Sequence, residues 1–141
     1  MATLNPYLSF KGNAEEAFNF YKSVFGGEFS AVMRFSEMPP EHKMPESEQN
    51  KIMHISMPVG QTVLMGCDVP EVFGNPLVGT NFNVSISADS KAEADKLFNG
   101  LVAGGKVTMP IGDAFWGSYF GMLTDRFDIQ WMVSYDTNPP Q

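Results

Sequence analysis

The order of hydrophobic and polar residues predicts the first three elements of this chain. Residues 4–10 alternate between apolar and polar side chains, which is typical of a half-buried strand. Over residues 14–25 the apolar side chains recur at helical spacing instead, with Asn13 at the N-cap position and Gly26-Gly27 after the last turn. Residues 28–35 return to a strand-like pattern. The segment therefore predicts strand, helix and strand, in that order.

Two further strands are predicted before the middle of the chain. Residues 52–59 and 62–68 have strand-like patterns, and Gly60-Gln61 between them is typical of a two-residue hairpin turn. The preceding residues 36–50 contain three prolines and four glutamates without an apolar period. This composition predicts a long, mobile acidic loop.

The same plan recurs later in the chain. When residues 14–29 are shifted by 78 positions, six of the sixteen residues fall on identical ones, including both glycines of the pairs at 26–27 and 104–105. Each pair follows a predicted helix and precedes a predicted strand. We infer that one supersecondary unit is used twice.

The second half completes the same order of elements. Its predicted elements are a helix from about residue 90 to residue 103 and strands over residues 82–88, 106–110, 117–124 and 129–134. We therefore expect an α+β fold in which a single domain, residues 1–141, holds two tandem βαβββ modules. Module one covers about residues 1–70, a linker rich in proline and glycine covers about residues 69–80, and module two covers about residues 81–135.

Composition and charge narrow the classes of partner. Of the 141 residues, 43% are apolar and 18% charged, as in ordinary globular proteins. The net charge of −7, without any basic cluster, argues against nucleic acid and anionic membranes as partners. The first ten residues lack the features of a signal peptide, and no apolar run approaches the ~20 residues of a membrane span. A single cysteine, Cys67, allows no internal disulfide, so we expect a cytoplasmic protein.

Short motifs along nearly the whole chain resemble those of the vicinal oxygen chelate superfamily, which includes glyoxalases, bleomycin-resistance proteins and ring-cleaving dioxygenases. The similarity is greatest to its PhnB-like branch. The motifs are PYLSF at 6–10, GNAEEA at 12–17, FGGE at 25–28, KIMH at 51–54, WG at 116–117, YFG at 119–121, DRF at 125–127 and IQW at 129–131. One departure is Asp128, where the family usually has glycine. The resemblance implies curled mixed sheets around an apolar cleft with the helices outside, a small-molecule ligand and a homodimer.

The resemblance also says where a metal would be expected. Metal-using members carry histidine, glutamate or glutamine on the first and last strands of each module. This chain has Asn5 and Asn83 on the two first strands, and Trp131 stands where metal-binding members have glutamate. Amide oxygens are weak ligands for zinc or iron, and an indole is none. We therefore expect no metal centre of the usual kind and no cofactor.

His54 is the candidate residue for both catalysis and ligand binding. Counting back from the Gly60-Gln61 turn places His54 opposite Cys67 and Ser56 opposite Met65, so that these four side chains share one sheet face. His54, Met65 and Cys67 are therefore ligand-binding candidates, and His54 is the candidate general base because histidine titrates near neutral pH. Two alternatives stay open. In the first, His54 has only a structural role and hydrogen-bonds with a backbone group or a tyrosine hydroxyl. In the second, Cys67 is a buried, inert thiol.

Aromatic residues near the carboxyl end form a second group of candidates. Trp116, Tyr119 and Trp131 are expected to form the wall of a ligand site, because their rings bind flat or cationic molecules and each retains one polar atom. The alternative is that these rings fill the protein core. The expected function is metal-free binding of a small amphipathic or aromatic molecule. The alternative function is that of a metal-dependent lyase, isomerase or dioxygenase with a degenerate site around His54.

Overall fold

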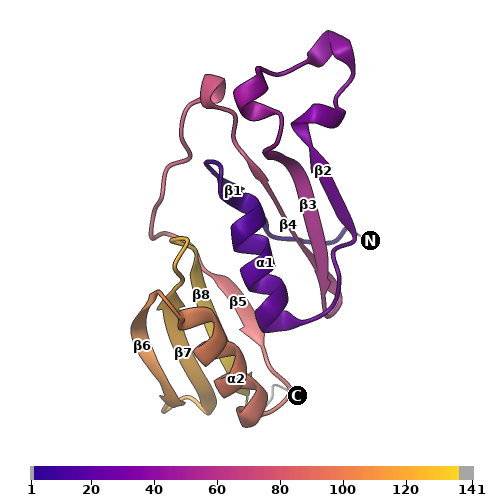
Figure 1. Cartoon of the computed structure of the whole chain (residues 1–141). Helices are drawn as coiled ribbons and strands as arrows, with labels where there is room; N and C mark the ends of the chain where they lie inside the picture. The colour runs from indigo at the N-terminus through magenta and orange to yellow at the C-terminus, as the bar shows by residue number, and fades with distance from the viewer. Residues whose placement is uncertain (1, 137–141) are drawn as a thin grey trace. The chain divides into compact units, whose positions relative to one another are not determined.

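The computed structural model describes residues 2–136, and the chain divides into two compact units with bounds Met1–Leu77 and Val78–Gln141 (Figure 1). Each unit contains one four-stranded mixed sheet and one α-helix. The expected α+β fold with two tandem βαβββ modules is therefore confirmed, and neither sheet closes on itself. None of the helices within residues 2–136 is both long enough and apolar enough to cross a membrane.

The first unit follows the predicted order of elements. These are β1 (Tyr7–Phe10), α1 (Ala14–Phe25), β2 (Ala31–Arg34), β3 (Ile52–Val59) and β4 (Thr62–Asp68). The sheet order is β1-β4-β3-β2, with β1 parallel to β4 and the other neighbours antiparallel. In the β3–β4 hairpin Val59 pairs with Thr62 and Ser56 with Met65, which confirms the predicted register.

The core of the first unit lies between α1 and one face of this sheet. Alternate strand residues on that face are buried, namely Leu8, Phe10, Ile55, Met57 and Leu64. From the helix, Phe18 is fully buried, and a Cβ added at Gly66 of β4 would lie 2.7 Å from its Cε1. Because side chains alternate along a strand, the remaining ones project from the opposite face of the sheet.

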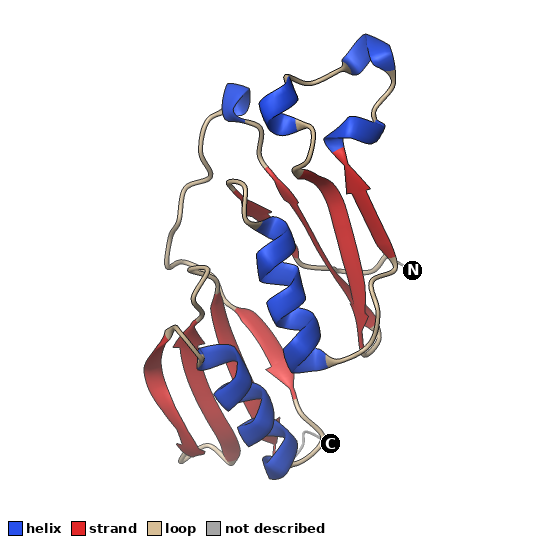
Figure 2. Cartoon of the chain, in the orientation of Figure 1, coloured by secondary structure: helices blue, strands red, loops and turns tan. Residues whose placement is uncertain are grey.

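Residues 36–50 are more ordered than the loop that the sequence predicts. Three short 3-10 helices divide this stretch, η1 (Phe35–Glu37), η2 (Pro40–His42) and η3 (Glu46–Glu48) (Figure 2). Prolines begin η2 and precede η3, where their fixed φ suits a helical start and no backbone donor is lost. Hydrogen bonds from Phe35 N to Lys51 O and from Ser36 N to Gln49 O close the segment at its base.

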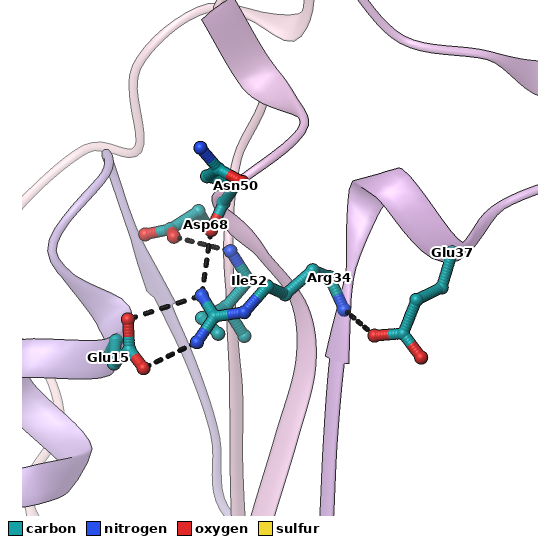
Figure 3. A network of polar contacts seen from close by, with 6 residues as sticks. All are labelled: Glu15, Arg34, Glu37, Asn50, Ile52 and Asp68. Atoms are coloured by element: carbon teal, nitrogen blue, oxygen red, sulfur yellow. Dashed lines mark hydrogen bonds and ion pairs between the residues drawn. The ribbon is translucent and has the colours of Figure 1, made fainter. Parts of the chain in front are cut away.

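Strand β2 is shorter than the predicted residues 28–35, and its pairing with β3 shifts at a bulge between Met33 and Arg34. Figure 3 shows the contacts that Arg34 makes there. Its guanidinium donates to both carboxylate oxygens of Glu15 in α1, at 3.2 and 2.6 Å, and to the backbone oxygen of Asn50 at 2.8 Å. The hydrogen bonds from Arg34 lower the pKa of Glu15. Arg34 therefore ties α1 to the end of β2.

A buried carboxylate determines where α1 begins. Asp68, at the end of β4, accepts backbone hydrogen bonds from Gly12 and Ala14 at Oδ1 and from Ile52 at Oδ2, each 2.9 Å long. The bond to Ile52 is drawn in Figure 3. Asn13, the predicted N-cap, makes no side-chain capping bond. The backbone N–H groups at the start of α1 therefore donate to Asp68, which lies more than 50 residues later in the chain.

The second unit repeats this architecture. Its elements are β5 (Val84–Ser87), α2 (Lys91–Val102), β6 (Lys106–Asp113), β7 (Ser118–Thr124) and β8 (Gln130–Asp136). The sheet order β5-β8-β7-β6, with β5 parallel to β8, corresponds strand for strand to that of the first unit. The N-cap of α2 is Ser90, whose hydroxyl accepts the Glu93 N–H at 3.0 Å. Within the expected linker, η4 (Glu71–Phe73) forms one more short helix.

Candidate functional site

The face of the first sheet that α1 leaves uncovered, here called the α1-distal face, carries most of the polar candidates. Strand alternation and register place on it the side chains of Tyr7, Ser9, Ala31, Met33, His54, Ser56, Pro58, Val63, Met65 and Cys67. Three of them, His54, Met65 and Cys67, are ligand-binding candidates from the sequence. The structure therefore brings these three together on adjacent strands.

Tyr7 connects the two reactive groups of this face. Its hydroxyl oxygen lies 3.4 Å from Nδ1 of His54, with the two ring centroids 5.8 Å apart. Cys67 lies on the neighbouring strand β4 and on the same face. Tyr7 as a whole residue is 48% exposed, while its hydroxyl lies against His54. Burial, followed by the hydrogen bond and charge of Cys67, raises the pKa of Tyr7 to about 12. The phenol is therefore a neutral hydrogen-bonding group at physiological pH.

This contact bears on the two alternatives for His54 and Cys67. His54 has a tyrosine hydroxyl as a partner, as one alternative anticipates, yet the pair lies on the α1-distal face rather than in the core. Cys67 is only partly buried and is a free thiol. Both side chains are therefore accessible within their unit, which a catalytic or ligand-binding role requires.

Sequence reasoning missed Tyr7 and Met33 as members of this group. The alternation of residues 4–10 already places Tyr7 on the polar side of its strand, which was a usable signal. Met33 pairs directly with His54, but that pairing depends on the register of β2, which the sequence does not reveal.

The three aromatic candidates of the second unit do not share one surface. Trp131 is 1% exposed, pairs with Leu123, and donates from Nε1 to Asp125 Oδ2 at 2.8 Å. Tyr119 donates to Asp95 Oδ1 of α2 at 2.6 Å, and this hydrogen bond raises its pKa. Both therefore lie on the α2 side of their sheet, and for Trp131 the structure favours the core-filling alternative.

Trp116 is placed differently from the other two. It lies in the turn between β6 and β7, is 56% exposed, and packs edge-on against Phe115 and Phe120. Phe120 pairs with Ser134 on the face of the sheet opposite to Trp131. Ligand contact by Trp116 stays a prediction.

The side chains at the expected metal positions do not fit the usual metal centre. Asn5 uses its Oδ1 to accept the Val63 N–H at 2.9 Å, and the Trp131 indole is committed to Asp125. Within residues 2–136 no group of three or more His, Cys, Asp and Glu side chains could hold a metal ion. No step of a reaction can be derived through a metal at these positions.

Comparison with known proteins agrees with this fold. The sequence model of the glyoxalase/bleomycin resistance protein/dioxygenase superfamily matches residues 3–133. Protein YjdN of Escherichia coli K12 is 28% identical over 146 residues, covering 97% of both chains. The crystal structure of protein PA1353 from Pseudomonas aeruginosa is 40% identical, with a TM-score of 0.84 over 96% of this chain and 98% of that one. A Bacillus cereus PhnB protein, named a putative 3-demethylubiquinone-9 3-methyltransferase, is 24% identical, with a TM-score of 0.75 over 95% and 99% of the two chains. The chain belongs to the glyoxalase/bleomycin resistance protein/dioxygenase superfamily.

Proposed function

We propose that this chain is a small-molecule-binding protein of the PhnB-like type, without the usual metal centre, and that its ligand binds on the α1-distal face. The observation that carries the proposal is the contact of Tyr7 with His54, on a sheet face that the helix leaves uncovered and that also holds Cys67. The likeness in fold to the Bacillus cereus PhnB protein and the similarity to YjdN support the PhnB-like assignment.

The chemistry of this face favours one class of ligand. Met33 and Met65 offer polarizable apolar surface, while Tyr7 and His54 offer a hydrogen-bond donor and an acceptor. Such a combination suits a molecule with an apolar or aromatic body and one hydrogen-bonding group. The net charge of −7 favours neutral or cationic ligands over anionic ones.

The test compares variants of the proposed site, Tyr7→Phe and His54→Gln, with the control Tyr119→Phe, which also loses one hydrogen-bonded tyrosine hydroxyl. A panel of neutral and cationic aromatic molecules is screened by the shift in melting temperature of the full chain. We expect Tyr7→Phe and His54→Gln to lose the shift produced by the best ligand. Tyr119→Phe, which loses its bond to Asp95 in the second unit, should keep that shift. A ligand that shifts all four proteins equally would contradict the proposed site.

The same preparation tests the alternative function, a metal-dependent lyase, isomerase or dioxygenase centred on His54. Elemental analysis is made on protein purified without an affinity tag or chelator. About one divalent metal ion per chain that is absent from His54→Gln would overturn the proposal that the ligand binds without a divalent metal. Protein that contains no divalent metal and does not respond to added divalent ions would support it.

The proposal extends to the whole chain. We infer one functional domain over residues 1–141, acting as a homodimer in the cytoplasm, with Trp116 as a further candidate for ligand contact. Light scattering coupled to size-exclusion chromatography should give twice the 15.6 kDa mass of one chain. A single-chain mass at micromolar concentration would contradict the dimer.

A further inference from the structure

Sulfur atoms are concentrated on the α1-distal face, and the proposed function uses them only as apolar surface. Met33 pairs directly with His54 between β2 and β3. Met65 precedes Cys67 by two residues on β4 and therefore lies on the same face. Side chains opposite one another on adjacent strands have Cβ atoms about 4.5–5.5 Å apart, and diagonal neighbours about 7–8 Å. One thiol, one imidazole and two thioethers are thus close neighbours.

Tyr7 holds the imidazole in a way that leaves one ring nitrogen available. Nδ1 of His54 faces the Tyr7 hydroxyl oxygen, so Nε2 is directed away from that contact. In the tautomer in which Nδ1–H donates to the Tyr7 oxygen, the lone pair of Nε2 is available to a ligand. Histidines that bind metals commonly hold their other nitrogen in such a hydrogen bond.

We propose that Cys67, His54 and Met65, with Met33 as a fourth donor, bind one copper(I) ion on the α1-distal face. Thiolate, thioether and imidazole are the soft donors that select this ion, and none of the four is an oxygen ligand of the kind that magnesium or calcium prefers. On binding, the S–H bond of Cys67 breaks, an S–Cu bond forms, and one proton passes to solvent without any change in oxidation state.

This site differs from the usual metal centre of the superfamily. Its donors come from β2, β3 and β4 of a single unit, whereas the usual ligands lie on the first and last strands of both modules. Two ligands alone, His54 and Cys67, would not make a stable site. The methionines supply the missing donors, and both are partly accessible.

The experiment titrates the reduced full chain with copper(I), without oxygen, against a coloured copper(I) chelator. We expect one ion per chain, thiolate-to-copper absorption in the near ultraviolet, and release of one proton. Cys67→Ser should abolish the absorption and the binding. His54→Gln and Met65→Leu should each weaken binding by at least about tenfold, and Tyr7→Phe by about 10–100-fold through its support of the imidazole.

The matched control is Met109→Leu, which replaces a 43% exposed methionine on β6 of the second unit. It should bind copper(I) like the wild type. Leucine conserves the volume of methionine, and thermal unfolding establishes that each variant is folded. If His54→Gln and Met65→Leu bind as tightly as the wild type, a lone thiol holds the ion and the proposal is overturned. The same holds if the wild type binds no more tightly than Cys67→Ser.

The inference stands apart from binding of an organic ligand. Copper(I) binding is measured without an organic ligand, and the melting-temperature shift is measured without copper. The wild-type chain can therefore show either activity without the other, and the activity that it lacks identifies the proposal that has failed.

Discussion

Two buried aspartates, one in each unit, order the backbone around them. Asp68 accepts three backbone hydrogen bonds, and Asp125 accepts the N–H groups of Phe127 and Ile129 and the indole N–H of Trp131. Each stands at the end of a strand, where the chain turns and its backbone donors have no strand partner. These carboxylates are therefore structural, and the α1-distal face is where side chains remain accessible to a ligand.

Replacement of Asp68 tests this structural role. Asp68→Ala leaves three N–H groups without their acceptor in a buried site, and we expect the free energy of unfolding to fall by about 3–5 kcal/mol. Asp68→Asn keeps one carbonyl oxygen and should cost less. Urea denaturation measures both values. The control Asp113→Ala removes an exposed carboxylate paired with Lys91 and should change the value by less than about 1 kcal/mol. Equal effects of the two alanine variants would contradict the role of Asp68.

At the scale of the elements, Gly66 of β4 lies close against Phe18 of α1. β4 passes beneath α1 there, and the position opposite on β1 is Leu8, whose backbone oxygen would lie 2.8 Å from an added Cβ. Glycine is needed for space at this position, not for an unusual backbone angle. The fit of α1 on its sheet therefore depends on one missing side chain.

Gly66→Ala should accordingly destabilise the protein. A methyl group would meet the ring of Phe18 and rigid backbone together, and relieving that overlap costs typically about 1–3 kcal/mol. Chemical denaturation measures the change. Gly112→Ala is the matched control, because it lies in β6 with no atom within 4 Å of the added Cβ. It should leave stability nearly unchanged or slightly improved, and a Gly66→Ala protein as stable as this control would refute the packing argument.

For the whole molecule, the division into two units means that each has a core of its own. Phe18 is buried between α1 and the first sheet, and Phe98 of α2 lies against Gly121 of the second. A substitution that weakens one core should therefore lower the local stability of its own unit more than that of the other unit.

Hydrogen exchange followed by mass spectrometry tests this expectation. Phe18→Ala and Phe98→Ala each remove a buried ring and should cost about 3–5 kcal/mol. We expect Phe18→Ala to accelerate exchange mainly in β1–β4, and Phe98→Ala mainly in β5–β8. The two variants serve as controls for each other. Uniform acceleration over the whole chain in both would mean that the units unfold as one.

Local patterns along the chain were sufficient to predict the order of elements, the internal repeat and the β3–β4 register. These depend on neighbours a few residues apart, through apolar periodicity, the glycine pairs and the short hairpin turn. Strand alternation was sufficient, for the same reason, to place His54, Met65 and Cys67 on one face.

The residues that contact this group, and the side chains that stabilise the helix ends, depend on long-range contacts that local sequence patterns do not encode. Tyr7 reaches His54, 47 residues away, only because β1 pairs in parallel with β4. Asp68, rather than Asn13, accepts the hydrogen bond from Ala14 N at the start of α1, although the two residues are 54 positions apart. Trp131 packs in the core rather than on a ligand wall because the alternation of β8 directs its ring to the α2 side. Strand pairing over long sequence separations, and the face that each helix covers, therefore came from the packing of the folded chain.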